Sequence, residues 1–152
     1  TAVACGYKGD SRCALPALGA GQAYIEVAAG AAHTVLLRSD GAAVACGQNG
    51  AGECSSPALG AGRSYTRVSA GFCHTVLLRS DGTAVACGGN WHGQCEVPAL
   101  DGGLLYTQVA AGGDHTVLLR SDGTATACGL NCEGRCDIPA LDEGLTYLTA
   151  AA

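Results

Sequence analysis

The stretch HTVLLRSDGTAVACG, residues 74–88, decides the fold class of this chain. Two apolar runs flank Asp81-Gly82, a pair that supplies the positive φ angles of a two-residue type I′ turn, so the stretch predicts a β-hairpin. A turn of this type fixes the register of the hairpin. The predicted pairs are Ser80 with Thr83, Leu78 with Val85, Val76 with Cys87, and Leu77 with Ala86. Both faces are apolar, so both need to be covered, as in a stack of sheets.

This hairpin belongs to a repeat that runs through the 152-residue chain with a spacing of 41 residues. The recurring positions are His33, His74 and His115, Tyr24, Tyr65, Tyr106 and Tyr147, and Pro-Ala-Leu starting at 16, 57, 98 and 139. Each unit has a further extended stretch that ends at a glycine, such as YTRVSAG at 65–71. No stretch shows the apolar spacing of a helical repeat. The sequence therefore predicts an all-β array of propeller-type blades with three strands, or four if the Pro-Ala-Leu segment forms an edge strand.

Numbered from the first residue, the single repeat domain 1–152 contains units at 1–41, 42–82 and 83–123 and a partial unit at 124–152. The chain starts on a predicted third strand and ends, at 147–152, on a predicted first strand without its hairpin. We expect an incomplete arc of a propeller, and we interpret the chain as a piece of something longer or a processed product. Open ends would expose apolar faces, so we expect further repeats or a second copy of the chain to cover them.

Composition excludes several functions. The formal charge is −5 and the eight basic residues are scattered, which argues against a nucleic-acid partner. No apolar run is long enough to span a membrane. No Ser-His-Asp order, phosphate loop or unique pair of carboxylates stands out from the repeat. We therefore expect a soluble protein that is not an enzyme and binds no cofactor.

Eight of the ten cysteines form four pairs, each with seven residues between its members. The pairs are Cys5 and Cys13, Cys46 and Cys54, Cys87 and Cys95, and Cys128 and Cys136. The spacing is too long for a zinc knuckle, and the C-x-x-C motif of redox proteins is absent. Disulfides within each pair and buried free thiols are both open interpretations. The first implies an extracellular protein and the second a cytoplasmic one. Cys73 and Cys132 stand outside the repeat and have no predicted partner.

Residues that recur in every unit are expected to serve the fold. Stacked sheets lie about 10 Å apart, so the three equivalent histidines are too far apart to share a metal ion, whose ligand nitrogens lie about 2 Å away. We expect each to bond to backbone at the start of a strand. The tyrosines are predicted to be packing residues. Arg38, Arg79 and Arg120 are each expected to pair with the aspartate of the adjacent turn.

The variable loop segments 48–53, 89–94 and 130–135 are the candidates for partner contacts. Trp91 and His92 occur in one unit only, and aromatic residues on loops often anchor partners. The other contact candidates are Gln48, Asn49 and Glu133.

The segment 87–95, preceded by Gly71-Phe72-Cys73-His74-Thr75 and Asp81-Gly82, resembles the repeat of the regulator of chromosome condensation family. That repeat typically reads Gly-x-x-His-(Ser/Thr), an apolar pair, Asp-Gly, and aromatic-Gly-x-Asn-x-x-Gly-Gln-Leu. The match covers nearly the whole chain in three full passes and a partial fourth. The short unit with VPAL after the loop also resembles the propeller superfamily of the type II β-lactamase inhibitory proteins. The resemblance implies a β-propeller, usually of seven blades, that holds proteins against its rim and loops.

This chain departs from the family pattern in two places. Cysteine stands where the family has an aromatic residue and a leucine, and the first loop, CGYKGDSRC at 5–13, has lost the Asn and the second Gly, as a capping unit can. The function we expect is a non-catalytic scaffold that binds a protein partner. The alternatives are a small-GTPase regulator of the nucleotide-exchange type, an accessory domain of a ubiquitin ligase, and a secreted carbohydrate-binding or enzyme-inhibitor propeller. The wedge associated with exchange activity is absent from these even units.

Overall fold

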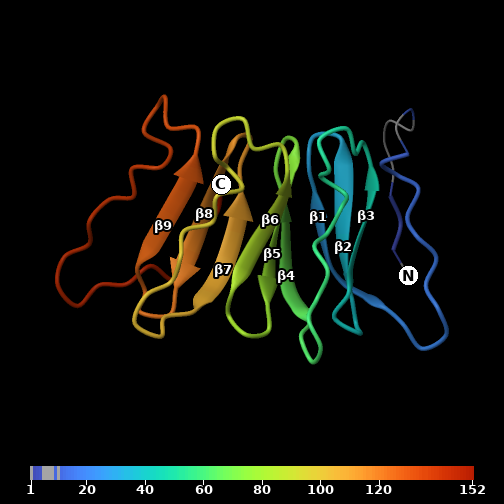
Figure 1. Ribbon diagram of the computed structural model, residues 1–152, viewed down its shortest axis with the longest axis horizontal. Coiled ribbons are helices and arrows are strands. Elements are labelled where there is room, and N and C mark those ends of the chain that lie inside the picture. Colours follow the sequence, from blue (N-terminus) through green and yellow to red (C-terminus); the bar gives the residue numbers. More distant parts are fainter. Residues whose placement is uncertain (1, 5–8, 10) are drawn as a thin grey trace.

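The computed structural model describes residues 2–4, 9 and 11–152, and it consists of three β-sheets that stand in a row (Figure 1). Each sheet is an antiparallel meander of three strands in chain order. Blade 1 contains β1 (Tyr24–Ala29), β2 (His33–Arg38) and β3 (Ala43–Gly47), blade 2 contains β4 (Tyr65–Ala70), β5 (His74–Arg79) and β6 (Ala84–Gly88), and blade 3 contains β7 (Tyr106–Ala111), β8 (His115–Arg120) and β9 (Ala125–Gly129). This arrangement confirms the predicted all-β blades and gives each three strands. The part of the chain that the structure describes contains no helix able to cross a membrane.

The predicted register of the hairpin is wrong by one residue. The loop between β5 and β6 has three residues, because the Gly82 N–H donates to Arg79 O (3.0 Å) and the Arg79 N–H donates to Thr83 O (2.8 Å). Gly82 has a φ of 78°, while Asp81 does not have a positive φ, so the turn is of type I followed by a glycine bulge. The observed pairs are Leu78 with Ala84, Leu77 with Val85, Val76 with Ala86, and Thr75 with Cys87.

The blades do not coincide with the sequence units numbered from the first residue, because each sheet crosses a boundary between two of those units. The predicted strand at 147–152 is not paired into a sheet. It nevertheless occupies the place of a first strand, because the Tyr147 N–H donates to Gly123 O (2.9 Å) as the Tyr106 N–H donates to Gly82 O (2.8 Å). The predicted opening strand lies partly outside the described residues, and residues 2–4 form no strand.

The hydrophobic core lies between the blades. Val35 and Leu37 of β2 pack against Tyr65, Val68 and Leu77 of blade 2. A second cluster, of Leu78, Tyr106 and Leu118, joins blade 2 to blade 3. Burial of each such side chain contributes about 1.5–3 kcal/mol, so the stacking of blades holds the chain together.

The end faces of the row lack this cover. Val27 of β1 is 64% exposed, whereas Val68, its equivalent in blade 2, is 6% exposed. The comparison shows how much apolar surface a neighbouring blade removes from water. The cover of these faces by further repeats or by a second copy of the chain stays a prediction.

Close contacts near the start of the middle strands require glycine. A Cβ on Gly71 would lie 2.3 Å from the backbone oxygen of Gly112 and 2.3 Å from the ring of His74. Gly30 is enclosed in the same way by Gly71 and His33. These glycines let successive blades approach at this end.

We expect Gly71→Ala to lower the free energy of unfolding by about 1–3 kcal/mol, the usual effect of overpacking. Gly113→Ala is the matched control, because a Cβ there meets nothing within 4 Å. Urea denaturation of both variants checks this, and equal midpoints would contradict it.

Candidate functional site

The variable residues gather at one end of the blades, which we call the loop face. It is formed by the glycine turns at 30–32, 71–73 and 112–114 and by the cysteine loops at 47–54, 88–95 and 129–136. Each cysteine loop is tied to the turn of its own blade, as where the Gly89 N–H donates to Cys73 O (2.7 Å). The backbone therefore holds both kinds of loop in a fixed relation.

An asparagine closes each cysteine loop from inside. Asn90 Oδ1 accepts the backbone N–H of Cys95 at 2.8 Å, and the equivalent bonds of Asn49 to Cys54 and Asn131 to Cys136 measure 2.8 and 2.9 Å. The Nδ2 of Asn49 also contacts Ser55 Oγ at 3.3 Å. The side chain of Asn49 is thus engaged within its own loop while it remains exposed, and its role as a partner contact stays a prediction. Its recurrence at the repeat spacing was the signal of a structural role.

Trp91 and His92 are exposed on the cysteine loop of blade 2. Trp91 is 69% exposed and its ring lies over Gly89, where an added Cβ would meet the ring at 2.4 Å. The backbone N–H of His92 donates to the buried Gln94 side chain (2.9 Å), which supports the loop from below. The structure therefore presents both side chains on a braced backbone.

Phe72 is a second exposed aromatic residue, which the sequence analysis missed. It is 58% exposed in the glycine turn of blade 2, the turn to which the loop of Trp91 is bonded. The available signal was that Ala31 and Gly113, both small, occupy the same place in the other units. The blades on either side form with a small residue at this position, so the fold does not require a large apolar one.

The remaining contact candidates lie in other blades. Gln48 is exposed on the loop of blade 1, and Glu133 is exposed on the loop of blade 3, where its carboxylate pairs with Arg135 at 2.6 Å. The structure does not join them to Trp91 as one cluster.

Cys46, Cys54, Cys73, Cys87, Cys95, Cys128, Cys132 and Cys136 are free thiols in the structure, so the disulfides predicted for these residues are not confirmed. Cys13, Cys46, Cys54, Cys87, Cys95, Cys128 and Cys136 are half-buried, Cys73 is also half-buried and Cys132 is exposed, while Cys5 lies outside the described residues. Burial is the main reason that the pKa values of Cys54, Cys87, Cys95 and Cys128 rise to about 11. A thiol with so high a pKa is a poor nucleophile at neutral pH. Among the described residues, no three His, Cys, Asp or Glu side chains form a metal-binding group.

The repeated histidines connect one blade to the next. His33 Nε2 lies 2.9 Å from Thr75 Oγ1, and Thr75 Oγ1 donates to Glu53 O at 2.7 Å. Since the threonine proton is used in this second bond, the histidine must donate from Nε2. Burial lowers the pKa of His33 and thereby favours the neutral ring. The expected backbone partner is therefore wrong, and the partner is the threonine of the following blade.

The same chain of hydrogen bonds, from histidine to threonine to loop carbonyl, joins blade 2 to blade 3, and we call it the relay. His74 Nε2 lies 3.0 Å from Thr116 Oγ1, which donates to Gln94 O at 2.8 Å. Burial lowers the pKa of His74 to about 4, against the opposing influence of Asp114. His33 is also buried and its pKa is lowered for the same reason.

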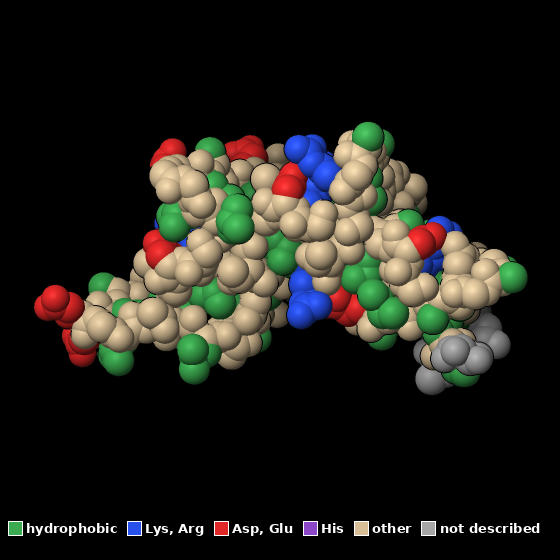
Figure 2. Space-filling view, turned by 90° about the horizontal axis from the view of Figure 1, so that it is seen from below, with side chains coloured by type: hydrophobic (Ala, Val, Ile, Leu, Met, Phe, Trp, Pro, Cys, Tyr) green, Lys and Arg blue, Asp and Glu red, His purple; other side chains and the backbone are tan. Residues whose placement is uncertain are grey.

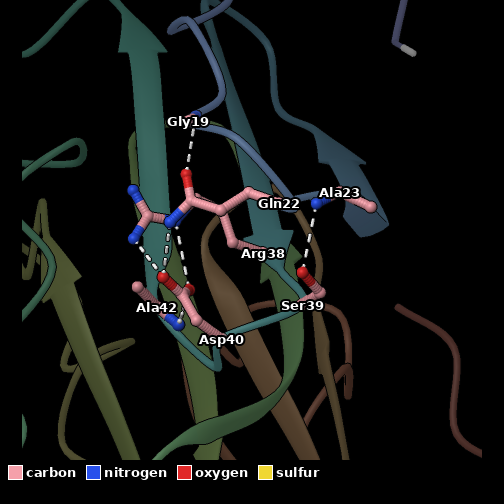
Figure 3. A network of polar contacts seen from close by, with 7 residues as sticks. All are labelled: Gly19, Gln22, Ala23, Arg38, Ser39, Asp40 and Ala42. Carbon is pink, nitrogen blue, oxygen red and sulfur yellow. Dashed lines mark hydrogen bonds and ion pairs between the residues drawn. The ribbon is translucent and has the colours of Figure 1, made fainter.

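The predicted pairing of arginine with aspartate across the turn is confirmed in blade 1 only (Figure 3). There Arg38 pairs with Asp40, which also accepts bonds from Gln22 Nε2 (2.9 Å) and the Ala42 N–H (3.1 Å). These bonds, that from Arg38 first, lower the pKa of Asp40 to about 2. The network fixes the turn and leaves no free charge for a ligand.

In the other blades the arginines turn inward. Arg79 and Arg120 lie beside Tyr65 and Tyr106, whose hydroxyls donate to Pro57 O (2.5 Å) and Pro98 O (2.7 Å). Each of these tyrosines is 3% exposed, which confirms them as packing residues. Asp81 pairs instead with Arg63 (2.7 Å). Figure 2 shows the molecule from below, at the end that carries the Asp-Gly turns. Acidic and basic side chains are scattered there among neutral ones.

Three-stranded blades that stack side to side and are joined by a recurring Gly-x-x-His-Thr contact define a β-propeller repeat protein. A family model described as the regulator of chromosome condensation (RCC1) repeat matches residues 24–53, 65–94 and 106–135. The chain therefore belongs to the RCC1 repeat family, and the resemblance seen in the sequence is confirmed. No curated protein matches the chain.

Solved structures of low identity share the fold. Prp20p from Saccharomyces cerevisiae is 22% identical, with 74% of this chain and 32% of that chain covered and a TM-score of 0.63. Human WBSCR16 is 21% identical, with 73% and 35% covered and a TM-score of 0.62. The ectodomain of the Arabidopsis thaliana receptor kinase ACR4 is 19% identical, with 75% and 43% covered and a TM-score of 0.59. The chain thus spans about a third of the first of these proteins.

We expect Thr75→Val to lower the free energy of unfolding by about 1–3 kcal/mol for each of the two buried groups that lose a partner, His33 Nε2 and Glu53 O. Thr34→Val is the matched control, because Thr34 Oγ1 donates to Arg12 O (3.1 Å) and accepts from no histidine of the described chain. Chemical denaturation measures both losses, and a loss for Thr75→Val no larger than that for Thr34→Val would contradict the relay.

Stability is expected to fall as the pH drops from 6.5 towards 4. The pKa of His74 is about 4 in the folded chain against 6.5 ordinarily, so unfolding takes up a proton in this window. Each such histidine lowers the free energy of unfolding by up to about 1.4 kcal/mol per pH unit. Asp40, with a pKa of about 2 against 3.8 ordinarily, contributes only at lower pH. Denaturation midpoints between pH 7 and 5 should therefore depend less on pH in His74→Gln than in the original chain, and equal slopes would count against this.

Proposed function

We propose that this chain is a protein-binding segment of a propeller and that its partner binds the loop face through Phe72 and Trp91. The observation that carries the proposal is the exposure of these two large aromatic side chains, 58% and 69%, on adjoining loops of blade 2. Exposed aromatic residues held in place are typical anchors of protein interfaces. Neither residue belongs to the repeat, so neither is needed to form a blade.

The geometry of the two loops supports this use. The Gly89 N–H donates to Cys73 O at 2.7 Å, and Asn90 closes the loop that carries Trp91. Because the backbone is already ordered, a partner loses little affinity to the ordering of these loops. His92, beside Trp91, adds a polar group at the rim of the surface.

The comparisons support a protein partner in general terms. Two of the similar structures concern protein partners: Prp20p was studied for its binding to Gsp1p and histones, and Kap60 was solved bound to yeast RCC1 (Prp20). The more specific versions of the proposal are a regulator of a small GTPase, an accessory domain of a ubiquitin ligase, and an enzyme inhibitor. Faster release of nucleotide from a GTPase on addition of the chain would identify the first.

We expect Trp91→Ala to weaken partner binding by about 2 kcal/mol, roughly 30-fold, with a smaller loss for Phe72→Ala. Leu105→Ala is the control, because Leu105 is 47% exposed but packs over Gly82 at the opposite end of the blades. Quantitative mass spectrometry of proteins retained by the immobilised chain and its variants provides candidates, and calorimetry with each purified candidate gives the affinity. A partner that binds Trp91→Ala as tightly as the original chain, or that is lost with Leu105→Ala, would contradict the proposed surface.

A further inference from the structure

We propose that, in an oxidising environment, the thiols of each blade pair with each other, as Cys46–Cys54, Cys87–Cys95 and Cys128–Cys136, and that each bridge closes the cysteine loop above it. The pairing itself is independent of the proposed function. Its consequence for binding rests on that function, since the bridge in blade 2 encloses the loop that carries Trp91.

The second thiol of every pair turns back over the start of its own loop. Cys54 Sγ donates to Gln48 O at 3.1 Å, Cys95 Sγ donates to Gly89 O at 3.3 Å, and Cys136 Sγ lies 3.8 Å from Leu130 O. Each acceptor is the carbonyl two residues after the first cysteine of the pair. The same asparagine bond holds the second cysteine in this position in all three loops.

A competing partner exists across the blade interface. Cys87 Sγ lies 3.9 Å from Glu53 O, the carbonyl bonded to the nitrogen of Cys54, and Cys128 bears the same relation to Gln94 O (3.7 Å) beside Cys95. The thiols thus form a row across the three blades. A first cysteine has one neighbour in its own loop and one in the preceding loop.

Two observations favour the neighbour in the same loop. In blades 2 and 3, besides burial, Cys95 raises the pKa of Cys87 more than Cys54 does, and Cys136 raises the pKa of Cys128 more than Cys95 does, as expected if the thiols of one loop lie closer. Blade 1 is divided, because besides burial Cys13 of the preceding loop raises the pKa of Cys46, whereas Cys46 raises that of Cys54. The pair within a loop is also separated by only seven residues, so it can meet before the blades dock. Burial in the folded chain raises the pKa of these thiols, so the attacking thiolate is then scarce. We therefore expect the disulfides to form during folding, before the thiols are buried.

The oxidant is a small disulfide such as oxidised glutathione. The thiolate of one cysteine attacks it, a mixed disulfide forms and one glutathione leaves. The second cysteine then attacks the protein sulfur, the intramolecular S–S bond forms and a second glutathione leaves. Two protein thiols lose two electrons and two protons, and one glutathione disulfide becomes two glutathione thiols.

The test is to refold the full chain in a glutathione redox buffer, block remaining thiols and digest with trypsin without reduction. Cleavage after Arg38, Arg63, Arg79, Arg120 and Arg135 separates the outcomes. The proposal expects fragments 39–63 and 80–120 each to be two hydrogen atoms lighter and fragment 121–135 to be linked to 136–152 through Cys128, with the blocked thiol found on Cys132 when the linked fragments are sequenced by tandem mass spectrometry. Links from 39–63 to 80–120, a bridge from Cys128 to Cys132, or ten free thiols would overturn it.

Cys54→Ser gives a second, independent readout. If pairing is within loops, this variant keeps the Cys87–Cys95 bridge and frees only Cys46, so fragment 80–120 stays lighter by two hydrogen atoms. If pairing crosses the blades, the variant frees Cys87. No binding partner takes part in these measurements. A result that contradicts the disulfide pairing therefore leaves the proposed binding surface untouched, and a result that contradicts the binding surface leaves the pairing untouched.

Discussion

The stacking of blades depends on a buried hydrogen bond that both interfaces between blades build in the same way. A neutral histidine at the start of one middle strand donates to the threonine of the next, and that threonine donates to the carbonyl of the loop between them, as in His33, Thr75 and Glu53. Buried polar groups are costly unless they are paired. The relay therefore admits one register between neighbouring sheets, and Gly30 and Gly71 supply the close approach that it needs.

Sequence reasoning predicted the strands because the hairpin and its apolar faces are local features of the chain. It failed at the turn, where Asp81-Gly82 suits two loop types that differ by one residue in length. Ser80 joins the loop in the structure, so that Gly82 alone has a positive φ. The dipeptide alone does not distinguish these two turns.

The candidate site was predicted in part. Trp91 and His92 were recognisable because they break the repeat on a loop, and the structure leaves both exposed. Phe72 was not predicted because it lies inside the Gly-x-x-His motif, whose glycine and histidine recur in all three blades and serve the fold. Asn49 stays a predicted contact, although its recurrence at the repeat spacing and its bond to Cys54 show that it also closes its own loop. The arginines show a third case, in which equal sequence around Arg38 and Arg79 leads to different partners in different blades.

The relay also gives the row of sheets a direction. One side of a blade offers an imidazole proton and the other offers a hydroxyl oxygen, so two blades fit only when they face the same way. If a whole unit is removed from the middle of the row, the two blades that then meet still present a histidine donor to a threonine acceptor. If only part of a unit is removed, the two faces that meet no longer match. Duplication or loss of entire units is thus the change in length that this architecture tolerates. The exposed loop side chains are free to diverge, because the loops enter the relay through the backbone oxygens of Glu53 and Gln94.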